Sequence, residues 1–190
     1  MAVKTMAKNT DTGQYNAGWH ELTIKSATDG TWTYSQGNDK RIIDLAFENY
    51  PEHMSHRVFE TVNKTTNEEF KIANLFRYAC AGIIDVLNDP TGKKPVIQYD
   101  DEVSNLVGTR INALFFKETN STTGKEYSKI FDIVPVAQVT DHITWTEDDV
   151  SRLKSKAESR YKKNNSPSNV DLGTVNIDTT TTSTNDEIPF

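Results

Sequence analysis

Alternating apolar and polar residues predict strands over much of the first half of the chain. Within residues 19–25, Leu22 and Ile24 are separated by polar side chains, which is the period-two pattern of a half-buried strand. The pair Asp29-Gly30 is a strong turn signal, and we expect it to end this strand. The other elements predicted for this half are a strand at 31–34, a turn at 37–39, and strands at 41–47 and 56–62.

The clearest helical pattern lies between residues 66 and 88. Thr66 and Glu69 have the spacing of a capping box, and Pro90 and Gly92 are expected to end the helix at about Asn88. The apolar stripe is wide, so we expect this helix to pack against a sheet in the core. Its members are Phe70, Ile72, Ala73, Leu75, Phe76, Ala79, Cys80, Ile83, Ile84 and Leu87.

The residues after 100 have the pattern of a long hairpin. Strands are expected at 106–117 and 126–134, and Gly124 supplies permissive backbone in the turn between them. Pro135 is expected to end the second strand or to mark a sheet edge.

A second helix is predicted over 146–163, opened by Thr146. It has acidic residues in its first turn and basic residues in its last, which matches the helix dipole at both ends. Its apolar stripe is thin, so this helix could pack at the rim of the domain or bridge to another subunit.

Residues 1–17 are polar and are expected to form a flexible arm. Residues 164–190 bury too little apolar area to offset the entropy of ordering, so we predict a disordered acidic tail.

Together these elements predict a mainly β domain over 18–145 with one or two helices. Mean hydropathy is −0.63, and no apolar run approaches the ~18 residues of a membrane span. The first 18 residues lack the apolar stretch of a signal peptide, so we expect a soluble cytoplasmic protein without a membrane partner. A single cysteine, Cys80, excludes a disulfide within the chain.

The net charge of −6 is unevenly distributed. The last 27 residues contain four acids and no Lys or Arg, whereas the first 163 contain 21 basic and 23 acidic residues. A near-neutral body of this kind is compatible with a local basic groove.

No pattern typical of an enzyme is present. The chain lacks a Gly-rich phosphate loop, a Gly-x-Ser-x-Gly elbow and a His-Glu-x-x-His pair. The four histidines are scattered, and the acidic run 100–102 is expected to be a solvated loop rather than a metal site. We therefore expect no catalytic residues, no metal and no cofactor.

The last residues combine features of a ligand peptide. Phe190 can fill an apolar pocket while its carboxylate pairs with an Arg, Pro189 limits the entropy lost on docking, and Asp186 and Glu187 suit a basic rim. With Ile188, this segment resembles the C-terminal tip of bacterial single-stranded-DNA-binding proteins, which typically ends Asp-Asp-Asp-Ile-Pro-Phe. The resemblance implies that the tip docks replication, recombination and repair enzymes. Asn185 replaces an acid of that pattern, which should weaken its charge but not its Phe anchor.

The body resembles a phage family of single-stranded-DNA-binding proteins with an OB fold, a five-stranded barrel that binds oligonucleotides. The resemblance is carried by 17–24 (Ala-Gly-Trp-His-Glu-Leu-Thr-Ile), 69–82 and 106–111 (Leu-Val-Gly-Thr-Arg-Ile), and it covers about residues 17–136. It implies an OB-like barrel that binds single-stranded DNA with little sequence specificity.

Such a site needs aromatic side chains that stack on bases beside cations that contact phosphates. Trp32 and Tyr34 are expected to be exposed, because they lie in a short polar hairpin with little to bury them. The alternative for the other candidates is that the aromatics belong to the core and the cations to solvated faces. The predicted DNA-binding residues are Trp32, Tyr34, Lys40, Arg41, Arg57, Arg110, Phe116, Lys117, Lys125, Tyr127 and Lys129, with Phe59 considered beside Arg57.

Three classes of function remain open at this point. A single-stranded-DNA-binding protein of phage origin, acting in replication, recombination or repair, accounts for the tail, the β-rich body and the lack of catalytic motifs. A β-rich phage virion or assembly protein would also have flexible ends, but it gives no reason for the tip. A nuclease or other replication enzyme has the least support. A homo-oligomer is compatible with the sequence.

Overall fold

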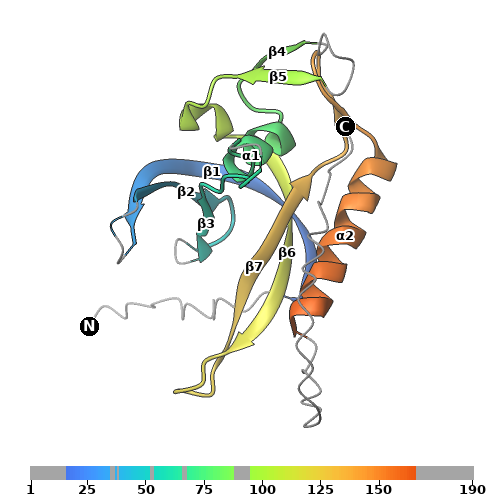
Figure 1. Ribbon diagram of the computed structural model, residues 1–190. Helices are drawn as coiled ribbons and strands as arrows, with labels where there is room; N and C mark the ends of the chain where they lie inside the picture. The colour runs from blue at the N-terminus through green and yellow to red at the C-terminus, as the bar shows by residue number, and fades with distance from the viewer. Residues whose placement is uncertain are drawn as a thin grey trace, which may run out of the picture.

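The computed structural model describes residues 16–34, 37, 39–51, 54–65, 68–87 and 95–165 (Figure 1). Almost all of the predicted N-terminal arm lies outside these residues. The predicted tail lies outside them from residue 166 onward, including the tip at 186–190.

One antiparallel sheet of five strands forms the body. Its strands are β1 (Gly18–Thr33), β2 (Asp39–Phe47), β3 (His56–Phe59), β6 (Arg110–Thr119) and β7 (Glu126–Pro135), in the order β3-β2-β1-β6-β7. The prediction of a mainly β fold with two helices is confirmed. The sheet is open rather than a fully hydrogen-bonded barrel, because β3 and β7 do not pair with each other in the described part of the chain. Helix α1 (Lys71–Ala79) contacts both of these end strands.

Strand β1 corrects the predicted turn at Asp29-Gly30. The strand runs through this pair without a break and is shared between two neighbours: its first half pairs with β6, and its second half pairs with β2. The Asp29 carboxylate accepts a hydrogen bond from the Gly30 amide, as in a turn, but it also binds Arg41 on β2. Pairing across the sheet therefore overrides the local turn signal. The second predicted turn is confirmed at Gly37, which has φ +78° and whose amide donates to the Tyr34 carbonyl at 2.8 Å. Residue 38 lies outside the described residues, and Asp39 already begins β2.

Helix α1 is much shorter than predicted. The backbone amides of Ile72 and Ala73, in its first turn, donate to the Glu69 carboxylate. Thr66, the other member of the expected capping box, lies outside the described residues. The left-handed conformation of Cys80 (φ 51°) ends the helix. The prediction that 83–87 is helical is wrong, because β4 (Ile83–Leu87) pairs with β5 (Val96–Tyr99) in a small separate sheet.

Helix α2 (Glu147–Asn165) confirms the predicted second helix, and Figure 1 shows it lying along β6 and β7. The Thr146 hydroxyl accepts a hydrogen bond from the Asp149 amide at 3.1 Å, so Thr146 caps the helix as expected. On its apolar side, Val150, Leu153 and Ala157 are buried against the body. The remaining short elements are η2 (Val103–Leu106), β8 (Gln138–Val139) and β9 (Thr144–Trp145).

The core lies between α1 and one face of the sheet, which we term the inner face. Alternate residues of β2 such as Ile43 and Leu45 point to it and are fully buried, and Phe76 of α1 lies against them in the same core. Residues between these positions point to the opposite, outer face. No helix among the described residues is long and apolar enough to cross a membrane.

Candidate nucleic-acid interface

The outer face of β1, β2 and β3 carries an exposed aromatic residue beside cations. Trp32 near the end of β1 is 43% exposed, and its ring meets that of Phe59 on β3 edge-on, with centroids 6.2 Å apart. The Arg57 guanidinium lies 5.2 Å from the centroid of the Trp32 ring. We call Trp32, Phe59 and Arg57 the platform.

Strand register places these side chains on one face. Directly opposed residues of an antiparallel pair share a face, and the pairs here are Trp32 with Lys40, Ile42 with Phe59, and Asp44 with Arg57. Because the intervening residues of β2 and β3 fill the core, these six are left on the outer face. Helix α2 covers the outer face of β6 and β7 but not this part of the sheet (Figure 1).

Asp44 fixes the orientation of the Arg57 head group. Its two carboxylate oxygens accept hydrogen bonds from Nε and Nη2 of Arg57 at 2.7 and 2.8 Å. The guanidinium that lies over the Trp32 ring is charged at neutral pH, and the bond to Asp44 raises the pKa of Arg57 further. A planar cation beside an indole is suited to contacting both a base and its phosphate.

The turn after β1 adds a second aromatic residue and cation. Tyr34 is 40% exposed, and Lys40 Nζ lies 5.7 Å from the centroid of its ring. The predicted exposure of Trp32 and Tyr34 is thus confirmed, while base stacking by either residue stays a prediction.

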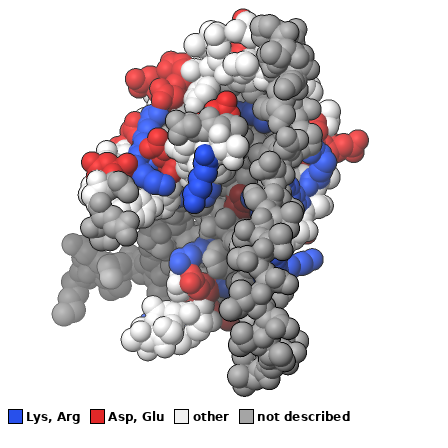
Figure 2. Space-filling view, viewed as in Figure 1, with Lys and Arg blue, Asp and Glu red and all other residues white. Residues whose placement is uncertain are grey.

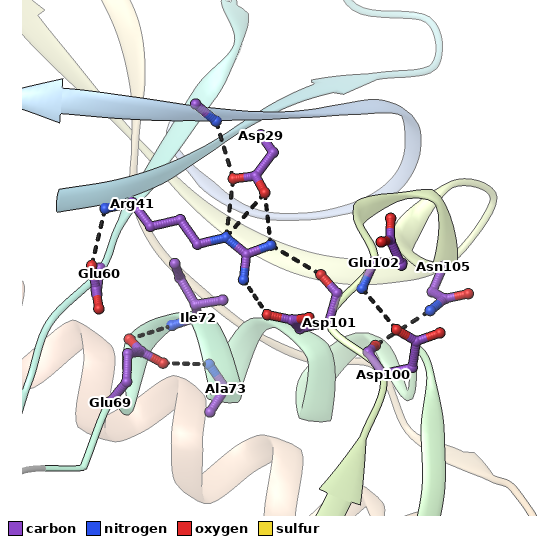
Figure 3. A network of polar contacts seen from close by, with 11 residues as sticks. Asp29, Arg41, Glu60, Glu69, Ile72, Ala73, Asp100, Asp101, Glu102 and Asn105 are labelled. Atoms are coloured by element: carbon purple, nitrogen blue, oxygen red, sulfur yellow. Dashed lines mark hydrogen bonds and ion pairs between the residues drawn. The ribbon is translucent and has the colours of Figure 1, made fainter.

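Arg41, in contrast, lies on the inner side of the same hairpin and is held by protein groups. Its guanidinium donates to the Asp29 carboxylate, to the Asp101 carboxylate and to the Asp101 carbonyl, as Figure 3 shows. These carboxylates raise the pKa of Arg41, and the same contact lowers the pKa of Asp29. All three nitrogens of the Arg41 guanidinium are engaged by two carboxylates and a carbonyl, whereas Arg57 binds one carboxylate through Nε and Nη2 only. We therefore assign Arg41 a structural role that ties the β1–β2 hairpin to the loop at 100–105.

The remaining predicted residues lie on β6, on β7 and in the turn between them, apart from the platform. Phe116 packs against Phe131 and against Tyr161 of α2, with centroids 6.2 and 5.6 Å apart, so its ring joins the helix to the sheet. The cations here are mostly paired with acids: Arg110 with Glu21 at 2.7 Å, Lys117 with Glu126 at 3.7 Å, and Lys129 with Glu118 at 2.5 Å. Lys129 also lies 5.2 Å from the Tyr127 ring, and Lys125 is exposed in the hairpin turn.

The charge pattern is interleaved rather than segregated. Figure 2 shows Lys and Arg beside Asp and Glu over the face in view. Among the described residues, no group of three or more His, Cys, Asp or Glu side chains could hold a metal ion. Because the cations alternate with acids, this surface suits binding through stacking and a few phosphate contacts better than binding through a broad basic surface.

A hollow of about 290 Å³ adjoins the platform and was not predicted. Asp44 lines it together with small residues of the outer face, among them Ser26, Thr28 and Ala46. The sequence does contain a signal for the hollow. Positions 26, 28, 30 and 32 would share one face of a continuous strand, and the first three of them carry small side chains or none, whereas the fourth is Trp32.

Comparison with known proteins found no matching family model and no similar curated protein. Function is therefore inferred from the residues and their geometry.

Proposed function

We propose that this protein binds single-stranded DNA with little overall sequence specificity, in the cytoplasm, during replication, recombination or repair. The bound strand lies over the outer face of β1–β2–β3 and the turn after β1. Binding, rather than catalysis, is the role of this surface.

The observation that carries this proposal is the exposed Trp32 ring with the Arg57 guanidinium over it. Leaving nearly half of an indole in water forgoes burial that would stabilise the fold, and Trp is enriched at interaction sites. Stacking of a base on an aromatic ring contributes about 1–3 kcal/mol and tolerates any base, because every base has a π-face. In the OB fold, oligonucleotides bind to the face of the second and third strands and to loops that include the one between the first two strands.

The paired state of most cations predicts a modest dependence on salt. Arg57 lies over the Trp32 ring, and Lys40 lies near the Tyr34 ring. If these two cations neutralise about two phosphates of a single strand, a plot of the logarithm of the association constant against log[salt] should have a slope of roughly −1.4. A surface that binds mainly by charge would have a much steeper slope.

Trp32→Ala tests the proposal, with Val139→Ala as a matched control. Val139 is also an exposed apolar residue, at 80%, but lies on β8. We expect Trp32→Ala to weaken binding of an oligo-dT by about 10-fold to 100-fold, on the order of the stacking energy, and Val139→Ala to leave it unchanged. Equal affinities for the wild type and Trp32→Ala would contradict the proposed site.

We further propose that the segment 185–190 recruits partner enzymes of replication and repair. The support is its resemblance to the tip of bacterial single-stranded-DNA-binding proteins, with Phe190 as the anchor and Ile188, Pro189, Asp186 and Glu187 beside it. This segment lies outside the described residues, so the proposal depends on the sequence alone.

A further inference from the structure

The hollow beside the platform exists because small residues meet there on the outer face. Ser26 of β1 lies directly opposite Ala46 of β2, and Thr28 lies directly opposite Asp44. Beside Ser26, a register shift in β1 makes Lys25 and Ser26 both exposed. The volume of the hollow, about 290 Å³, is far above the ~10–15 Å³ that a cavity needs, in the same measure, to hold one water molecule.

The polar groups of the hollow favour a ligand edge that combines a donor with an acceptor. Asp44 offers a carboxylate, each of whose oxygens accepts one hydrogen bond from Arg57 and has a second lone pair available. The hydroxyls of Ser26 and Thr28 can donate or accept, and Lys25 is a donor. A group that donates to Asp44 and accepts from a neighbouring hydroxyl or ammonium satisfies this set.

The hollow and the platform are within reach of one nucleic-acid strand. Thr28 and Trp32 are four residues apart on β1, about 13 Å at the rise of a strand, which is the length of about three or four stacked nucleotides. Gly30 lies between them on the outer face, and a Cβ at this position would already meet Ile42 at 3.4 Å. Because Gly30 has no side chain, the path between the hollow and Trp32 stays open. The Asp44–Arg57 pair also joins them, since Asp44 lines the hollow and Arg57 lies over Trp32.

We propose that the hollow takes one base of the bound strand and favours bases with an exocyclic amino group over thymine. This inference rests on the proposed binding of single-stranded DNA and adds a base preference to it. The N4 amino group of cytosine can donate a hydrogen bond to the Asp44 carboxylate. The acceptors beside N4 on the cytosine ring can accept from the hydroxyls or from Lys25. Thymine has the O4 carbonyl in place of the amino group, and its one donor on this edge, N3–H, lies between the O2 and O4 carbonyls. A hydrogen bond from N3–H to Asp44 would therefore bring a carbonyl oxygen close to the carboxylate.

Oligo-dC and oligo-dT of equal length test this preference, because both are pyrimidines and stack comparably on the platform. We expect the wild type to bind a 12-mer of dC about fivefold to tenfold more tightly than one of dT, the lower end of what a base-edge contact provides. Equal affinities for the two oligonucleotides would overturn the inference and leave the proposed function intact. Failure to bind either one at low salt would instead refute the proposed function.

Three variants locate the preference in the hollow. Ala46→Leu should fill the hollow and bring the dC-to-dT ratio close to one. Thr28→Val, which removes a hydroxyl at nearly constant shape, should lower the ratio about twofold or more. Asp44→Asn should reduce it further, since an amide can also donate to thymine O4.

The matched control for Thr28→Val is Thr31→Val. Thr31 is exposed on the same strand, but it lies opposite Arg41 and so on the other face of the sheet. We expect the wild-type ratio in this control. A wild-type ratio in both Ala46→Leu and Asp44→Asn, measured on protein whose thermal unfolding matches the wild type, would show that the preference arises elsewhere and would overturn the inference.

Discussion

His56 makes the stability of the fold depend on pH between about 6.5 and 4. It lies on β3 opposite Leu45, and burial lowers the pKa of its imidazole from 6.5 to about 4. Lys71 at the start of α1 acts in the same direction, and Asp44 opposes it. The unfolded chain therefore takes up a proton at a pH at which the folded chain does not. Stability that is present above pH 6.5 is lost as the pH falls toward 4.

The size of this effect follows from the two pKa values. Each unit of difference corresponds to about 1.4 kcal/mol, so the full loss below pH 4 is about 3 kcal/mol. At pH 5 the unfolded imidazole is almost fully protonated and the folded one is mostly neutral, which costs about 2 kcal/mol relative to pH 7. These are upper values, because His56 retains some contact with solvent.

Urea unfolding at pH 7 and pH 5, followed by tryptophan fluorescence, measures this loss. Trp145 is buried and reports unfolding. His56→Gln removes the titrating group, so other groups that titrate in this range contribute equally to both proteins. The wild type should lose about 2 kcal/mol more than His56→Gln between the two pH values. An equal loss in both proteins would show that the imidazole is not shielded in the folded state, and the reasoning would fail.

Three further predictions concern the fold, the predicted site and the tip. Gly82→Ala should destabilise the protein by more than about 2 kcal/mol in urea unfolding, because φ is +61° and a Cβ would overlap the Asp100 carbonyl. Gly124→Ala, also at positive φ but with open space around it, should cost only about 1 kcal/mol, and equal costs would contradict the packing argument. Arg41→Met should lower stability by about 1–2 kcal/mol and leave oligo-dT affinity nearly unchanged, whereas a large loss of affinity with normal stability would make Arg41 a DNA contact. Removing Phe190 should abolish capture of replication and repair enzymes from bacterial lysate without changing DNA affinity, and capture of the same partners by both proteins would refute its role as the anchor.

The elements that could be predicted are those whose local pattern agrees with their tertiary surroundings. Alternation identified β2, β6 and β7, and the acid-first, base-last pattern identified α2. The prediction failed where distant contacts override local preference. Asp29-Gly30 has the composition of a turn, but pairing with β2 keeps it extended. The apolar stripe that continues past Cys80 suggested helix, although its β-branched residues suit strand β4 equally well.

The site was predictable to the extent that it depends on single residues. The polar surroundings of Trp32 and Tyr34 indicated their exposure. No local signal could show that Arg41 would be held by an acid 60 residues away, or that Phe116 would pack against α2. The hollow was missed for a different reason: placing a turn at Asp29-Gly30 cut β1 in two and hid the single face that its outward residues form.

Titration of the wild-type protein with an oligo-dT and with a duplex of equal length tests the central claim most directly. Tryptophan fluorescence is the readout, since Trp32 is the exposed indole whose ring lies on the proposed surface. We predict saturable quenching by the single strand at low salt, weaker binding of the duplex, and a log–log salt slope of roughly −1.4. Absence of quenching by the single strand, or equal affinity for single strand and duplex, would contradict the proposed function.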